Sequence, residues 1–180
     1  MRGAAATWAA FAAIAVPVAL ADSPALRQDN IPTYGVTLKV PASWIGVDPS
    51  KLTMQHLAFV LADPKATVGF HADLNRLVSP VPAGTPIRKW LLGNSAARYL
   101  ALGTLETVKI HGVTALEYAS SRLEKSGGIP LYTLEFAFNH GGRAYLFTYT
   151  TPASAKATFE KLFRASAATI RFLATSPRSA

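Results

Sequence analysis

Hydrophobic and polar positions alternate along several stretches of the chain, and this pattern predicts β-strands that are half-buried in a sheet. In YGVTLKV, residues 34–40, the valines and the leucine fall on one face, and the threonine and the lysine fall on the other. Pro41 has no N–H to donate to a neighbouring strand, so we expect this strand to end there. Trp44 follows and is expected to fold back over the end of the core. Residues 57–64 and 66–78 predict a hairpin whose turn is ADPKA.

Two further hairpins are predicted in the second half of the chain. His111-Gly112 forms a tight turn between two alternating stretches, and SGGIP at 126–130 forms the next turn. Residues 131–150 alternate on both sides of Gly141-Gly142, whose glycines allow the positive φ values of a tight hairpin. The aromatic residues of this half supply most of the expected core: Tyr118, Tyr132, Phe136, Phe138, Tyr145, Phe147 and Tyr149.

Two helices are predicted among these strands. Thr85-Pro86 places a capping residue and a proline at the start of a helix over residues 87–101. A second helix follows Thr151-Pro152 and has an apolar stripe of Phe159, Leu162, Phe163 and Ile170. Because the hairpin strands carry apolar side chains on both faces, we expect an α+β fold with a sheet covered on both sides.

The first 21 residues have the composition of a secretory signal peptide. Met1-Arg2 supplies a positive charge, an uncharged apolar run follows, and Ala19-Leu20-Ala21 is a small-residue cleavage site. The alternative is a retained membrane anchor, since about 20 apolar residues can span a bilayer. We expect cleavage after Ala21 and a periplasmic or secreted protein. The remaining chain is predicted to have a flexible leader at 22–33, one domain at 34–173 and a disordered tail at 174–180.

Composition narrows the function further. The chain of 180 residues has no cysteine, which excludes disulfides, a thiolate nucleophile and cysteine-ligated zinc. Its formal net charge of +8 serves solubility, or favours an acidic protein partner or an anionic membrane surface. The basic residues are spread along the chain, and nucleic acid is a poor partner for an exported protein, so we expect no nucleic-acid binding.

The order of these elements resembles the PsbP-like family over about residues 34–173. The resemblance rests on YGVTLKVPASW, in which a strand leads to a P-x-x-W turn, on VKIHGVTALEYAS, on the long hairpin, and on the last helix ending near IRF. It implies an α-β-α sandwich with a central antiparallel sheet, here of about six to seven strands flanked by helices. Plant members assist the oxygen-evolving machinery, and a eukaryotic relative binds a small GTPase. The resemblance implies binding or assembly, and nothing in the chain indicates a photosynthetic role.

Few residues are candidates for chemistry. His71 and Asp73 are two apart on a predicted strand and could hold a metal, or be an exposed polar pair. Glu117 and Glu135 lie in neighbouring strands and could act as an acid–base pair, or face water beside basic residues. Ser120-Ser121 lacks the surroundings of a nucleophilic serine. We therefore assign no catalytic residue and no cofactor.

The sequence favours an exported, non-catalytic binding or assembly factor of the bacterial cell envelope, a monomer or weak dimer that acts through protein–protein contacts. Candidate anchors for a partner are Trp44, Arg88, Lys89 and Trp90, because interfaces are enriched in tryptophan and arginine. The alternative for each is ordinary core or solvated helix surface. A second hypothesis is a carrier of a small apolar molecule or lipid in an aromatic-lined pocket, and a third is a hydrolase-type enzyme.

Overall fold

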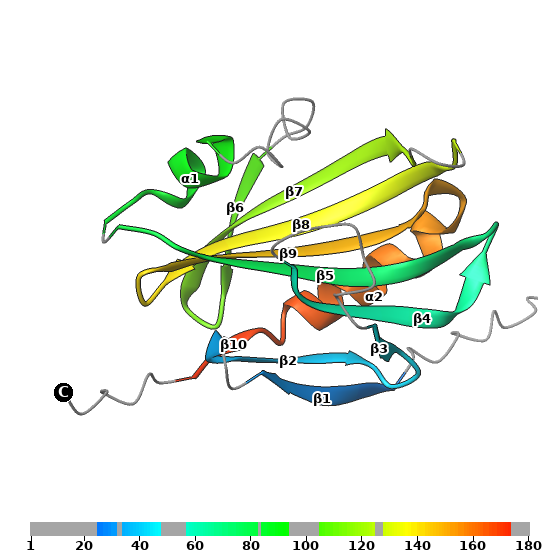
Figure 1. Ribbon diagram of the computed structural model, residues 1–180, viewed down its shortest axis with the longest axis horizontal. Coiled ribbons are helices and arrows are strands. Elements are labelled where there is room, and N and C mark those ends of the chain that lie inside the picture. Colours follow the sequence, from blue (N-terminus) through cyan, green and yellow to red (C-terminus); the bar gives the residue numbers. More distant parts are fainter. Residues whose placement is uncertain are drawn as a thin grey trace, which may run out of the picture.

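Two antiparallel sheets and two helices make up the structure, a computed structural model (Figure 1). It describes residues 25–31, 34–47, 57–82, 84–93, 105–124 and 128–173. The proposed signal peptide and the proposed tail at 174–180 lie outside the described residues.

The larger sheet has seven strands in the order β3-β4-β5-β9-β8-β7-β6, and all neighbours are antiparallel. Hairpins connect β4 to β5, β6 to β7 and β8 to β9, while β9 lies beside β5 and so joins the two halves of the sheet. The strands are β3 (Ile45–Val47), β4 (Leu57–Thr67), β5 (Phe70–Pro80), β6 (Leu105–Ile110), β7 (Val113–Leu123), β8 (Pro130–His140) and β9 (Arg143–Pro152).

The smaller sheet has the order β1-β2-β10. Strand β2 (Val36–Pro41) lies in its centre, between β1 (Leu26–Ile31) and the short β10 (Arg171–Phe172). The first and last strands described therefore meet on the same central strand.

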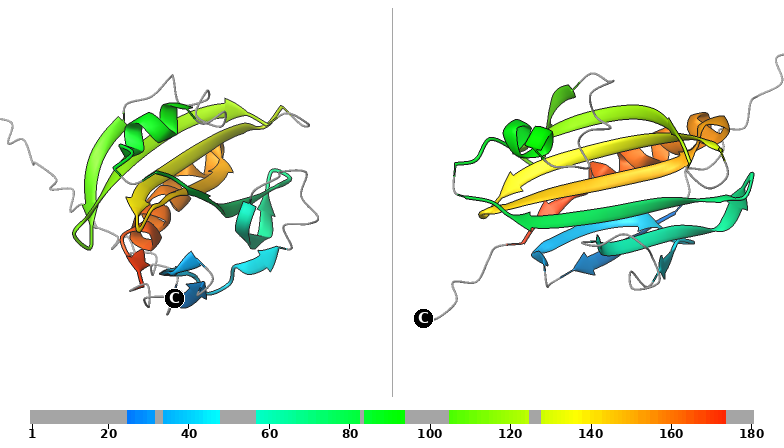
Figure 2. Two further views of the ribbon diagram at one scale, coloured as in Figure 1. Left: turned by 60° about the vertical axis from the view of Figure 1, so that its left-hand side comes forward. Right: turned by 45° about the horizontal axis from the view of Figure 1, so that its top comes forward.

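The two helices lie on opposite faces of the larger sheet (Figure 2). Helix α2 (Lys156–Ala167), entered through a 3₁₀ turn at Ala153–Ala155, lies between the larger sheet and β2. The face toward α2 carries the main core, which includes Leu134, Phe136, Phe138, Tyr145, Phe147 and Tyr149. On the other face, the short helix α1 (Ile87–Gly93) covers a smaller cluster of Leu91, Leu116, Tyr118, Ala137 and Leu146.

A buried hydroxyl connects α2 to both sheets. The Ser166 hydroxyl donates a hydrogen bond to the Lys39 carbonyl of β2 at 2.6 Å, and the Tyr149 hydroxyl of β9 lies 3.0 Å from the Ser166 oxygen. Because the serine proton points to Lys39, Tyr149 is the donor to Ser166. Thr169, just after α2, also accepts the Lys39 N–H at 2.7 Å.

Aromatic rings fill the space around this hydroxyl. The Phe163 ring of α2 lies 5.1 Å from that of Tyr149 and 6.2 Å, edge-on, from that of Trp44. Trp44 thus packs over the end of the core, as its position after Pro41 predicted.

The predicted α-β-α sandwich is confirmed only in part. The antiparallel sheet has seven strands, within the expected range, and the His111-Gly112 and Gly141-Gly142 turns lie where predicted. Among the described residues, one face is covered by α2 together with the smaller sheet, and the seven residues of α1 lie over part of the other face. The predicted continuation of that helix to residue 101 lies outside the described residues.

Two local predictions are wrong. The turn of the β4–β5 hairpin lies at Val68-Gly69, where both residues have positive φ, and ADPKA lies inside β4 at an irregular pairing between Ala62 and Ala66. The Asp-Pro pair, which predicted a turn, thus lies at a bulge within a strand. Residues 26–31 of the expected flexible leader form β1, whose six residues all pair with β2.

Strand β1 also contributes a charge to the interior between the sheets. The Asp29 carboxylate lies 3.9 Å from the Arg76 guanidinium of β5, and the Arg76 side chain is 3% exposed. Burial lowers the pKa of Arg76 to about 10, although Asp29 acts to raise it. The same strand contributes Arg27, which donates a hydrogen bond to the Trp44 carbonyl at 2.8 Å.

We therefore expect that a chain beginning at residue 32 is less stable than one beginning at residue 25. The shorter chain loses the pairing with β2 and leaves Arg76 without Asp29, and removing one partner of a buried ion pair costs about 3–5 kcal/mol. Urea unfolding of both chains measures the difference. Equal midpoints would show that β1 adds nothing to the fold.

Candidate functional site

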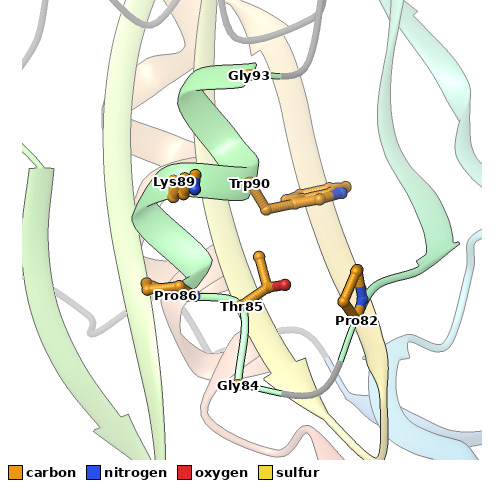
Figure 3. A pocket seen from close by; sticks show the side chains of 7 residues that line it. All are labelled: Pro82, Gly84, Thr85, Pro86, Lys89, Trp90 and Gly93. Carbon is orange, nitrogen blue, oxygen red and sulfur yellow. The ribbon is translucent and has the colours of Figure 1, made fainter.

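A surface groove lies beside α1 and is lined by both the helix and the proline-rich segment that precedes it. It encloses about 620 Å³, and its lining consists of Pro82, Gly84, Thr85, Pro86, Lys89, Trp90 and Gly93 (Figure 3). Figure 3 shows the Trp90 indole extending from α1 toward Pro82. A half-buried aromatic ring beside exposed prolines and a lysine can hold an apolar group next to an anionic one.

Hydrogen bonds to main-chain groups of the proline-rich segment hold it against the large sheet. The Val81 N–H donates to the Gly142 carbonyl of the β8–β9 turn at 3.0 Å, and the Asn139 side chain donates to the Thr85 carbonyl. The Thr85 N–H in turn donates to the Pro82 carbonyl at 3.1 Å, which closes the turn that leads into α1. These contacts give the groove a fixed wall.

Three of the four predicted anchors lie on α1. Trp90 is half-buried and also packs against the cluster under α1, whereas Arg88 and Lys89 are exposed. The structure brings Lys89 and Trp90 together in the groove. The sequence prediction missed Pro82, Thr85 and Pro86 as lining residues, although their place in the loop before α1 was the available signal.

The prediction of Trp44 as an anchor for a partner is wrong. Its side chain is 2% exposed and packs against Phe163, so it offers no surface to a partner. Its position after the β2 strand end directs it into the core, and the alternative interpretation of ordinary core applies.

The interpretation of Glu117 and Glu135 as an acid–base pair, one of the two alternatives from the sequence, is also wrong. Glu117 is in register with Phe136, and Glu135 is in register with Tyr118, so the two carboxylates point to opposite faces of the sheet. Glu117 faces α2 and forms an ion pair with Arg164. The two glutamates do lie on neighbouring strands, as predicted, but the register of β7 and β8 places their side chains on opposite faces.

Glu135 instead shares a face with Asp73, the face on which α1 lies. Asp73, Thr150, Thr133 and Ser120 form one row across β5, β9, β8 and β7, and Asn75, Thr148, Glu135 and Tyr118 form the next row. We call these two rows the polar face. The following row contains Leu77, Leu146, Ala137 and Leu116, which lie under α1.

Both carboxylates of the polar face are half-buried and their pKa values are raised. Burial raises the pKa of Asp73 to about 7, while the Thr150 hydroxyl and the Arg122 charge act to lower it. Burial likewise raises the pKa of Glu135 to about 7, against the Thr148 hydroxyl and Arg122. Loss of hydration therefore outweighs the single nearby guanidinium at both positions.

The candidate metal pair lies on one face of β5, as predicted from its spacing, with His71 exposed. A ring nitrogen of His71 lies 2.7 Å from the Asp63 carbonyl oxygen. Within the described part of the chain, no group of three histidine, aspartate or glutamate side chains is placed to hold a metal ion.

One gap in the interior of the described part of the chain is too small to hold an apolar cargo. Among the described residues, the gap beside Tyr34, Arg76 and Phe147 measures about 210 Å³ between atoms and leaves no room for a water molecule. None of the described helices has the length and apolar character needed to cross a bilayer.

No protein-family model matches the chain, and no curated protein matches its sequence. Solved structures do match. LpqN, involved in cell envelope biogenesis of Mycobacterium tuberculosis, is 10% identical with a TM-score of 0.55, and the match covers 86% of this chain and 87% of LpqN. A protein from Bacteroides thetaiotaomicron is 15% identical with a TM-score of 0.57. That match covers 81% of this chain, which spans 47% of that protein.

A cyanobacterial PsbP from Synechocystis is also among the matches, at 18% identity and a TM-score of 0.49, over 88% of this chain and 98% of that protein. A PsbP protein is thus among the structures that this chain is similar to, in line with the resemblance predicted from the sequence. At these identities the likeness concerns the fold alone. The likeness assigns no function, so the function has to be inferred from the groove beside α1 and from the polar face.

We expect the raised pKa values to make the free energy of unfolding fall as pH rises from about 4 to about 7. An acid whose pKa is higher in the folded state binds more protons there, so its contribution is fully present below the unfolded pKa and is lost as pH rises through the folded pKa. Asp73→Asn and Glu135→Gln should each make the decrease in the free energy of unfolding between pH 5 and pH 7 smaller. The difference from the parent chain should be at most about 2–3 kcal/mol for each variant.

Urea unfolding at several pH values measures how steeply the free energy of unfolding changes with pH in the parent chain and in each variant. Glu106→Gln, at an exposed carboxylate of β6, is the matched control and should leave the slope unchanged. Identical slopes in the parent chain and in Asp73→Asn would contradict the raised pKa of Asp73.

Proposed function

We propose that this chain is an exported, non-catalytic binding protein of the bacterial cell envelope, and that a protein partner docks at the groove beside α1. The observation that carries the proposal is the meeting of Trp90 and Lys89 in a preformed groove of about 620 Å³. Tryptophan at the edge of a pocket is the kind of residue that contributes most to binding energy at interfaces.

The charge around the groove indicates the partner's chemistry. Arg88 and Lys89 are exposed on α1, Arg143 is exposed at the start of β9, and Pro80 pairs with Arg143 just before the groove begins. A segment with an apolar side chain for the groove and acidic residues beside it would complement this surface.

The envelope location has separate support. LpqN, one of the matching structures, is involved in cell envelope biogenesis, and the first 21 residues of this chain have the composition of a signal peptide. For the carrier hypothesis, the gap beside Tyr34, Arg76 and Phe147 among the described residues leaves no room for a water molecule and so offers no place for a cargo.

Photocrosslinking in cells tests the docking site. Gly93 lines the groove, and a Cβ added there meets no atom within 4 Å, so a photoreactive residue fits at this position. We expect irradiation to give one discrete adduct with a second protein from position 93. A photoreactive residue at Lys109, exposed on β6, is the control position and should give none.

The contribution of charge is tested in the same cells. Reversal of both charges, with Arg88→Glu and Lys89→Glu, should lower the adduct from position 93 at least about fivefold, because like charges then oppose an acidic partner. No adduct from position 93, or the same adduct from positions 93 and 109, would overturn the docking site.

A further inference from the structure

The outer edge of the smaller sheet is formed by strand β1, the end strand of the order β1-β2-β10. All six residues of β1 pair with β2, without a bulge. Figure 1 shows β1 at the lower margin of the molecule, with no labelled element below it. Within the described residues, β1 therefore has a strand partner on one side only.

The register of β1 and β2 identifies the main-chain groups that face outward. The Ala42 N–H donates to the Ala25 carbonyl at 2.8 Å, and this pair continues the β1–β2 register by one step. In an antiparallel ladder, pairs that exchange hydrogen bonds alternate with pairs that do not. The odd-numbered residues of β1 therefore bond to β2, and the N–H and C=O groups of Leu26, Gln28 and Asn30 point away from it.

The same alternation holds on the other side of β2. Lys39 is opposite Gln28, and its N–H and C=O groups face away from β1. The N–H donates to the Thr169 hydroxyl, and the carbonyl accepts from the Ser166 hydroxyl. The outward N–H and C=O groups of Gln28 have no such neighbour in the described part of the chain, so this edge can pair with another strand.

We propose that β1 pairs with β1 of a second copy of this chain, antiparallel across a two-fold axis at Gln28. In this register Gln28 is opposite Gln28, and Leu26 is opposite Asn30. All three outward residues then exchange hydrogen bonds, and about six main-chain hydrogen bonds form between the two copies. A two-fold axis uses the same surface on both subunits, which is the commonest arrangement in homodimers.

The charges of β1 are complementary in this register. Arg27 and Asp29 share the inner side of the strand, where Asp29 forms the ion pair with Arg76. The two-fold axis at Gln28 places Arg27 opposite Asp29 of the second copy, and Asp29 opposite Arg27 of the second copy. Opposite charges on neighbouring strands stabilise their pairing. Inward-pointing charges without such partners would instead oppose edge-to-edge pairing.

Strand β6, at an edge of the larger sheet, fits a second copy less well. A two-residue turn connects β6 to β7, so the outward residues of β6 include Thr107 and Lys109. Pairing across a two-fold axis at Thr107 would place Glu106 opposite Val108 of the second copy, without charge complementarity. Lysine and proline commonly protect edge strands from pairing. Strand β1 contains neither, whereas β6 has Lys109 exposed on its edge.

Light scattering of the chain from residue 22 onward measures the oligomeric state. The contact consists mainly of main-chain groups, so we expect a weak dimer whose molar mass rises toward twice the single-chain value as concentration increases. Gln28→Pro removes the outward N–H but no bond to β2, and should keep the single-chain mass at the same concentrations. Gln28→Ala loses the same side chain and keeps the N–H, so this matched control should dimerise like the parent chain.

A disulfide reports the register directly. The chain has no cysteine, so Gln28→Cys introduces one in each copy. Hydrogen-bonded residues opposite each other have Cα atoms about 5.5 Å apart, within the span of a disulfide. Lys39→Cys is the control, because the two exposed Lys39 positions would lie three strand spacings, roughly 14 Å, apart. We expect oxidation to give a covalent dimer at least about tenfold faster from position 28 than from position 39.

Three results would overturn the proposal. The first is a single-chain molar mass of the parent chain at every concentration. The second is dimerisation of Gln28→Pro as strong as that of Gln28→Ala, which would place the interface elsewhere. The third is equal disulfide formation from positions 28 and 39. Circular dichroism checks that each variant is folded, and if Gln28→Pro is not, the two cysteine variants decide. The groove beside α1 lies on the larger sheet, so these outcomes leave the proposed function to its own test.

Discussion

The hydrogen bonds of Ser166 set the arrangement of the molecule, because this hydroxyl contacts the small sheet through Lys39 and the large sheet through Tyr149. A buried serine costs stability unless its hydroxyl is satisfied, and both of its bonds exist only when α2 lies between the two sheets. The rings of Trp44, Tyr149 and Phe163 then pack around the same point. The polar contact gives the position of the helix, and the rings supply the apolar burial that makes this position stable.

This arrangement leaves the two faces of the large sheet unequal. Among the described residues, the face toward α2 is covered by a helix, a second sheet and the Arg76–Asp29 pair, whereas the seven described residues of α1 lie on the opposite face. Helix α1 packs on the row that contains Leu77, Leu146 and Leu116, and the two neighbouring rows on the same face carry the polar residues. Within the described residues, the groove and the polar face thus lie on the face of the large sheet that carries α1.

Alternation along single strands made much of the fold predictable, and pairing between distant segments explains most of what was missed. The β8–β9 hairpin lies where its aromatic alternation and its two glycines placed it. Strand β1 was missed because LRQDNI has no alternation of its own and becomes a strand only through β2. Lys89 and Trp90 were chosen as candidate anchors by residue type, and this stays a prediction. The walls of their groove could not be predicted, since Asn139 and Gly142 of another hairpin hold them. Asp73 and Glu135 were each singled out, yet only the register across β9 places them on one face.

The groove beside α1 and the polar face lie on the same side of the large sheet. A partner too large for the groove alone would extend toward the polar face, where it would meet two carboxylates that ionise near neutral pH. Binding at one site and protonation at the other would then influence each other, because any ligand that changes the ionisation of a group is in turn affected by that ionisation.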